Sequence, residues 1–150
     1  MLVRRTQITS VRRCARLLAL VAALSLAASC ADAGRDPRNE LPFGVVDAPR
    51  PGDVVPPGRI LVGGWAMDDS AVDEILVYLD SHFAASTTLN VARPDVAKAF
   101  PQYARSSDVH GWNVRIEVPN SPGAHTIIVQ AVDDHGATRD LGTVTITIPK

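Results

Sequence analysis

Two pairs of neighbouring aspartates are the residues of this sequence best suited to chemistry. Asp68 and Asp69 follow one apolar run, and Asp133 and Asp134 follow another. If both runs are strands of one β-sandwich, their turns lie at the same end and bring four carboxylates together. Like charges repel at such distances, and carboxylate oxygens suit Ca²⁺ as ligands. The pattern therefore raises the hypothesis of a calcium site, and with it a calcium-dependent adhesion domain.

A plainer interpretation of the same four aspartates stays open beside this one. Aspartate is favoured in turns because its side chain hydrogen-bonds the backbone two residues on. The sequence offers neither the spacing of an EF-hand loop nor a bidentate glutamate near these positions. No other metal or cofactor is indicated.

The remaining chemical groups favour a protein that is not an enzyme. No two of the histidines, His82, His110, His125 and His135, stand at a metal-ligand spacing, and we expect structural or solvated roles for them. The sequence contains no G-x-S-x-G motif and no glycine-rich phosphate loop. No cysteine follows Cys30, which excludes a disulfide or a thiol site in the later part of the chain.

Aromatic residues suggest a carbohydrate-binding module as an alternative function. Trp65, Trp112 or Tyr78, if exposed on a sheet face, would give a platform on which sugar rings stack. Trp112 shares its parity with the apolar residues of its run, and Trp65 lies in a run that predicts a central strand. We therefore expect both tryptophans to pack in the core.

One short helix is predicted, over residues 93–101. Pro94 suits a first helical position, and Pro101 suits the residue just past the end. We expect this segment to cap an open sheet edge. The alternative is a recognition surface formed by four exposed residues, Lys98, Gln102, Tyr103 and Arg105.

The beginning of the chain has the order of a secretory signal. Residues 1–29 carry five arginines and no acid, and the apolar run 17–28 is too short for a membrane-spanning helix, which needs roughly 20 residues. The segment 26–30, Leu-Ala-Ala-Ser-Cys, resembles the lipobox of bacterial lipoproteins and predicts lipidation of Cys30, although Ala27 stands where leucine is usual. Cleavage near Ala31 and free secretion are the alternative. Ala31 after the cysteine favours the outer membrane, if the host has one.

Charge argues against nucleic acid as a partner. After position 29 the chain keeps all 16 acidic residues but only ten of the 15 basic ones, a net charge of −6. Such a segment lacks the basic stripe that phosphate binding requires.

Alternation of apolar and polar residues predicts an all-β fold. Residues 59–67, 73–80, 110–118, 126–132 and 142–148 read as strands separated by turn residues. Short strands at this spacing suggest an immunoglobulin-like antiparallel sandwich over residues 43–150 with one short helical insert. Residues 30–42 are polar and aperiodic, and are expected to be a linker.

A set of short motifs resembles the bacterial Ig-like domains of cell-surface and secreted proteins. The motifs are Gly64-Trp-Ala66 with Asp68, Val77-Tyr-Leu-Asp80, Arg93-Pro-Asp-Val-Ala97, Phe100-Pro101, Gly111-Trp112, Gly123-Ala-His-Thr126, Ala131 and 133–136. The resemblance implies a non-catalytic sandwich module in which His125 hydrogen-bonds a loop carbonyl. The family commonly has glycine after Asp80, whereas this chain has Ser81-His82, which predicts a changed turn.

The sequence thus predicts an envelope-associated lipoprotein with a signal peptide at 1–29, a linker at 30–42 and one Ig-like domain at 43–150. Its expected role is that of a binding or structural module, with a protein or glycan at the cell envelope as partner.

Overall fold

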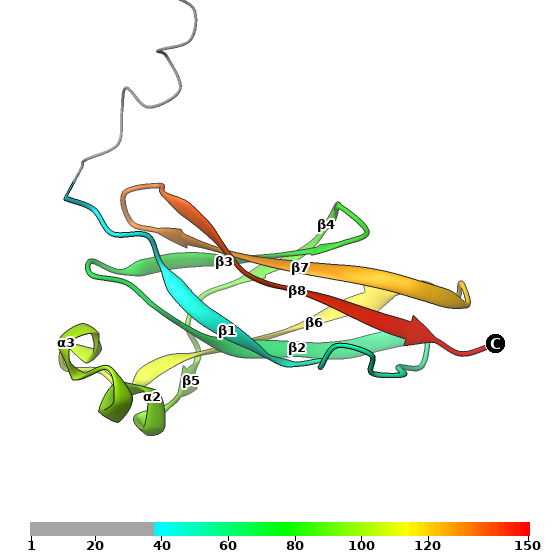
Figure 1. Cartoon of the computed structure of the whole chain (residues 1–150), viewed down its shortest axis with the longest axis horizontal. Helices are drawn as coiled ribbons and strands as arrows, with labels where there is room; N and C mark the ends of the chain where they lie inside the picture. Colours follow the sequence, from blue (N-terminus) through cyan, green and yellow to red (C-terminus); the bar gives the residue numbers. More distant parts are fainter. Residues whose placement is uncertain (1–37) are drawn as a thin grey trace, which may run out of the picture. The chain divides into compact units, whose positions relative to one another are not determined.

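A computed structural model describes residues 38–150, which lie in one compact unit (Figure 1). The predicted signal peptide, the predicted lipidation site Cys30 and residues 30–37 of the predicted linker fall outside the described residues.

Eight strands form two antiparallel sheets that pack face to face (Figure 1). The first sheet has the order β1-β2-β6-β5 and the second the order β4-β3-β7-β8. The bounds are β1 Phe43–Ala48, β2 Gly58–Met67, β3 Val72–Leu79, β4 His82–Thr87, β5 Val91–Ala92, β6 Val109–Val118, β7 Gly123–Asp133 and β8 Thr138–Ile148. This order is that of a constant-type immunoglobulin sandwich with β4 added at one edge, and it confirms the predicted fold class.

Alternation places one face of each long strand in a shared core. On β6, Trp112, Ile116 and Val118 point inward as predicted, and Trp112 is only 1% exposed. Core residues of the other strands are Ile60, Val62, Ala66, Ile75, Val77, Ile127, Val129, Ala131, Val144, Ile146 and Ile148. The expected core position of Trp112 is therefore confirmed.

Gly64 shows why the first sheet needs glycine beneath β1. A Cβ atom at this position would collide with the carbonyl oxygen of Val45 and would lie 2.9 Å from the Trp112 ring. The absence of a side chain therefore lets β1 pair closely with β2 above the buried tryptophan.

The predicted helical insert is present, but it does not cap a sheet edge. It consists of two short helices, α2 Pro94–Ala99 and α3 Pro101–Ala104, so Pro101 begins a second turn and does not end the insert. Both helices lie on the outer side of the first sheet (Figure 1). There they cover a second apolar cluster of Phe43, Trp65, Met67, Val96, Ala97, Phe100, Tyr103 and Ala104.

This arrangement corrects the expectation for Trp65. The residue faces the outer side of β2, opposite to the main core, and its ring lies 5.4 Å from that of Phe100. An ion pair from Arg93 Nη1 to Asp47 Oδ2 at 2.7 Å ties the start of α2 to β1, at the far edge of the same sheet. The insert therefore crosses the sheet from the β5 edge to the β1 edge.

The turn after β3 keeps two residues although it lacks glycine. Leu79 pairs with His82, so Asp80 and Ser81 form the loop, with φ values of 49° and 67°. Positive φ at both positions defines a type I′ turn, the kind that matches strand twist. Glycine is the residue that adopts this conformation without steric cost, so Ser81 is strained.

Replacing Ser81 with glycine should therefore stabilise the domain. We expect Ser81→Gly to raise the free energy of unfolding by about 1 kcal/mol, measured by chemical denaturation. The matched control is Ser86→Gly in β4, which should lower it by about 0.5–1 kcal/mol because glycine weakens a strand. A loss of stability in both variants would contradict this description of the turn.

Candidate functional site

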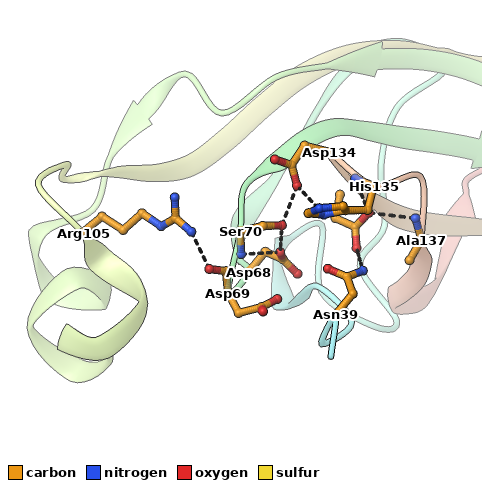
Figure 2. Close-up of polar contacts among 9 residues, drawn as sticks. Asn39, Asp68, Asp69, Ser70, Arg105, Asp134, His135 and Ala137 are labelled. Atoms are coloured by element: carbon orange, nitrogen blue, oxygen red, sulfur yellow. Dashed lines mark hydrogen bonds and ion pairs between the residues drawn. The ribbon is translucent and has the colours of Figure 1, made fainter. Parts of the chain in front are cut away.

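Three segments meet at the end of the sandwich where the described chain begins, and we name this end the acidic tip (Figure 2). It comprises Asn39, which precedes β1, the turn residues Asp68 and Ser70 between β2 and β3, and Asp133 and Asp134 where β7 ends. The structure thus brings together three of the four aspartates proposed as calcium ligands: Asp68, Asp133 and Asp134.

Asp133 is the most deeply buried carboxylate of the tip, with 1% of its surface exposed. Its Oδ1 accepts hydrogen bonds from the backbone N–H groups of His135 at 2.9 Å and Ala137 at 2.7 Å. Its Oδ2 accepts one from Asn39 Nδ2 at 2.6 Å. Asp133 therefore holds the β7–β8 turn in the way turn-forming aspartates do, and also fixes the incoming chain.

Asp68 is buried as well, at 4% exposure, but only one of its two carboxylate oxygens accepts hydrogen bonds. Its Oδ1 accepts hydrogen bonds from the backbone N–H of Ser70 at 2.8 Å and from the Ser70 hydroxyl at 2.7 Å. Its Oδ2 is buried without a hydrogen-bond partner. Burial raises the pKa of Asp68, the Ser70 hydrogen bonds oppose that rise, and the carboxylates of Asp69 and Asp133 add to it.

Ser70 links two of these carboxylates. Its hydroxyl lies within hydrogen-bond distance of Asp134 Oδ1 as well as of Asp68 Oδ1. A hydroxyl has one proton, so it donates to only one of the two at a time. The Ser70 contact, with His135 beside it, lowers the pKa of Asp134. His135 Nδ1 lies 3.0 Å from the same Asp134 oxygen, so Asp134 has a second partner while Asp68 Oδ2 has none.

The fourth predicted ligand, Asp69, is exposed, and its backbone carbonyl accepts a hydrogen bond from the Arg105 guanidinium (Figure 2). Three residues that contact these carboxylates, Ser70, His135 and Asn39, were not predicted as site residues. His135 offers a ring nitrogen within 4.8 Å of ligand atoms of Asp133 and Asp134. Asn39 lies inside the predicted linker, where no periodic pattern marks a residue that packs on the domain.

The four residues of the predicted recognition surface do not form one exposed surface. Lys98 and Gln102 are exposed. Tyr103 is half-buried in the outer apolar cluster, and its hydroxyl donates a 2.8 Å hydrogen bond to Glu40. Arg105 is exposed and contacts the 68–70 turn. Two of the four side chains thus fasten neighbouring segments of the domain.

The histidines make contacts within the protein. The ring of His110 contacts the carbonyl oxygen of Ser107 at 2.7 Å, and that of His82 the carbonyl oxygen of Asp80 at 2.9 Å. His125 Nε2 makes the expected contact with a loop carbonyl, that of Ser121, at 2.8 Å, while its Nδ1 lies 2.6 Å from Asp80 Oδ2.

The opposite end of the sandwich, named here the far end, carries an exposed aromatic residue beside a hollow. Phe83 is 63% exposed, and its ring stacks edge-on against Tyr78 with 6.1 Å between centroids. A hollow of about 470 Å³ lies next to it. Its lining comprises Arg59, Leu79, His82, Phe83, Ala84, Arg115 and Glu117.

Residues 38–150 include no helix with the length and apolar character needed to cross a membrane.

No family model matches the chain, and no curated protein matches its sequence. Among solved structures, the chain is similar to the fibronectin(III)-like modules of CbhA from Clostridium thermocellum, with 17% identity and a TM-score of 0.50. That match covers 73% of this chain and 47% of the CbhA chain, so this chain spans about half of that length. The likeness shows the fold, an immunoglobulin-like sandwich.

Two further structures match at lower TM-scores. CopC from Methylosinus trichosporium OB3b is 10% identical with a TM-score of 0.38, over 71% of this chain and 93% of CopC. The CARDB domain of the PF1109 protein from Pyrococcus furiosus, solved in complex with di-metal ions, is 11% identical with a TM-score of 0.39, over 74% of this chain and 94% of that domain. At these scores neither match informs the site of this chain.

The contacts of His125 predict that stability depends on pH. Both ring nitrogens face acceptors, so the imidazolium is the form that donates from both. The hydrogen bond to Asp80 and that to Ser121 raise the pKa of His125. The resulting stability is present below the unfolded-state pKa of about 6.5 and is lost as pH rises through the higher folded-state pKa.

We therefore expect the melting temperature to fall by roughly 2–5 °C as pH rises from about 6 to about 8.5. His125→Gln should remove most of this dependence, whereas His82→Gln, an exposed neighbour, should keep it. An equal pH dependence in wild type and His125→Gln would show that the pair with Asp80 does not titrate as described.

Proposed function

We propose that this chain is an exported lipoprotein whose Ig-like sandwich acts as a non-catalytic binding or structural module at the cell envelope. The order of the sequence supports this proposal: a basic segment, an apolar run, the lipobox-like residues 26–30 and then a short linker. Acyl chains on Cys30 would hold the sandwich at a membrane surface, each buried CH₂ contributing about 0.8 kcal/mol.

One observation supports a non-catalytic role: the acid and base side chains named below are already hydrogen-bonded within the protein. Asp133 holds a turn, and Asp80 accepts the Thr126 N–H at 2.9 Å while it pairs with His125. His110 is buried, and its ring lies within hydrogen-bond distance of the loop carbonyl of Ser107. Groups committed to backbone and to one another in this way serve the fold, because a general acid or base must face its substrate.

The path of the chain supports a role in display. The described residues begin at the acidic tip, and Lys150 lies at the other end of the sandwich (Figure 1). A tether on Cys30 would reach the domain through residue 38, so the far end with Phe83 is the part best placed to meet partners.

The intact mass of the mature protein, purified from the membrane fraction, tests the anchor. We expect a chain that begins at Cys30 and carries acyl groups, because the lipobox-like residues direct lipidation to that cysteine. The Cys30→Ser variant should lose the acyl mass and leave the membrane fraction. Cys14→Ser, which changes the other cysteine, should behave as wild type.

An unmodified mature chain beginning near Ala31 would contradict the anchor. The module would then be freely secreted, and soluble ligands would become the place to look for its partner.

A carbohydrate-binding module is the second candidate, favoured by the hollow at the far end. An exposed phenylalanine stacked on Tyr78 offers an apolar face to a sugar ring. Arg59, Arg115 and Glu117 line the same hollow and offer groups that hydrogen-bond hydroxyls.

Retardation by soluble envelope and plant polysaccharides, measured by affinity electrophoresis, tests this candidate. If a glycan retards wild type, Phe83→Ala should weaken the interaction at least about tenfold, as expected for loss of a stacking anchor. Leu61→Ala, which removes another exposed apolar side chain at 46% exposure, should leave retardation unchanged. Equal retardation of both variants would exclude Phe83 as the platform.

A further inference from the structure

Two buried oxygen atoms at the acidic tip have no hydrogen-bond partner. They are Oδ2 of Asp68 and Oδ1 of Asn39. Figure 2 shows the amide of Asn39 beside the Asp68 carboxylate, with its oxygen turned toward that carboxylate. Both atoms accept hydrogen bonds and cannot satisfy each other, and an unsatisfied buried acceptor costs about 1–3 kcal/mol.

Asp133 explains why Asn39 presents oxygen rather than nitrogen to Asp68. The amide Nδ2 donates to Asp133 Oδ2 at 2.6 Å. Exchanging the two amide atoms would place two acceptors against each other at that distance. The Asp133 carboxylate cannot rotate away either, because its other oxygen receives the N–H groups of His135 and Ala137.

The charges that act on Asp68 are negative, and the His135 ring at the tip lies 3.0 Å from Asp134 Oδ1, where it pairs with that carboxylate. Asp68 lies near enough to Asp69 and Asp133 for their carboxylates to affect its ionisation. Asp134 shares the Ser70 hydroxyl with Asp68. The described partners of Asp68 are the N–H and hydroxyl of Ser70, both neutral.

From these observations we propose that a divalent cation, with Ca²⁺ the best match, binds between Asp68 and Asn39 and fastens the incoming chain to the acidic tip. Asp68 Oδ2 and Asn39 Oδ1 are the ligands, and Asp133 is the positioning residue that orients the amide. Carboxylate and amide oxygens on turns suit Ca²⁺, which takes about 6–8 oxygen ligands and accepts water among them.

The ion would act as a staple. Asn39 comes from the segment before β1, Asp68 from the β2–β3 turn and Asp133 from the end of β7. Binding would therefore order the segment 39–42, in which Pro42 is already fully buried. The bound ion would fix the angle at which the chain before residue 39 enters the sandwich. This holds with or without a lipid anchor on that chain.

Thermal unfolding of the full chain, stripped with EDTA and then titrated with CaCl₂, tests the site. At 1 mM Ca²⁺ we expect the melting temperature to rise by at least about 5 °C, because the ion binds only the folded tip. Asp68→Asn should abolish this rise. In EDTA this variant should be at least as stable as wild type, since its amide can donate to Asn39 Oδ1.

Asp53→Asn is the matched control, because it makes the same change at an exposed aspartate between β1 and β2, whose neighbour Val54 bridges Thr147 near the end of β8, away from the tip. It should keep the full response to Ca²⁺. Absence of a Ca²⁺ response in wild type, or its persistence in Asp68→Asn, would overturn the proposal. The first outcome would indicate a proton on Asp68, shared with Asn39, in place of the ion.

Hydrogen exchange measured by mass spectrometry tests the staple itself. Ca²⁺ should slow exchange in residues 39–44 of wild type at least about tenfold, and should leave that segment of Asp68→Asn unchanged. Binding of Ca²⁺ without protection of this segment would overturn the fastening role.

Discussion

A buried carboxylate must be surrounded by donors or by positive charge, and the acidic tip of this sandwich depends on how that requirement is met. Asp133 meets it with two backbone N–H groups and the amide of Asn39. That solution sets the β7–β8 turn and draws the chain before β1 onto the domain. It also turns the Asn39 oxygen toward Asp68, whose Oδ2 remains without a partner. The hydrogen bonds that satisfy Asp133 thus leave the neighbouring Asp68 carboxylate in need of a cation or a donor.

The rest of the fold shows which features alternation can predict. The long strands β2, β3, β6, β7 and β8 were predicted because β-branched residues repeat on one face. Strands β1, β4 and β5 were missed, since β4 reads His-Phe-Ala-Ala-Ser-Thr and β5 has two residues. These edge strands bury little on either face, and tertiary pairing rather than pattern makes them extended. Trp65 was misplaced because parity does not reveal that helices cover the outer face of β2.

The candidate site was partly predictable for the same reason. Asp68 and Asp133 end two strands that a sandwich brings to one end, so their proximity follows from topology. Asn39 could not be found, because its role depends on a hydrogen bond across 94 positions of sequence. The amide and not a fourth carboxylate completes the arrangement, while Asp69 is exposed. With the proposed tether, the acidic tip would determine how the domain is held at the membrane. The far end would remain accessible to partners.

A crystal structure of the protein grown in the presence of CaCl₂ would test the central claim, a cation between Asn39 and Asp68, most directly. The account predicts an ion bound to Asp68 Oδ2 and Asn39 Oδ1 at about 2.3–2.6 Å, the distances typical of calcium. A direct hydrogen bond between the two side chains would contradict it. A water molecule at ordinary hydrogen-bond distance from both, about 2.7–3.0 Å, would contradict it equally.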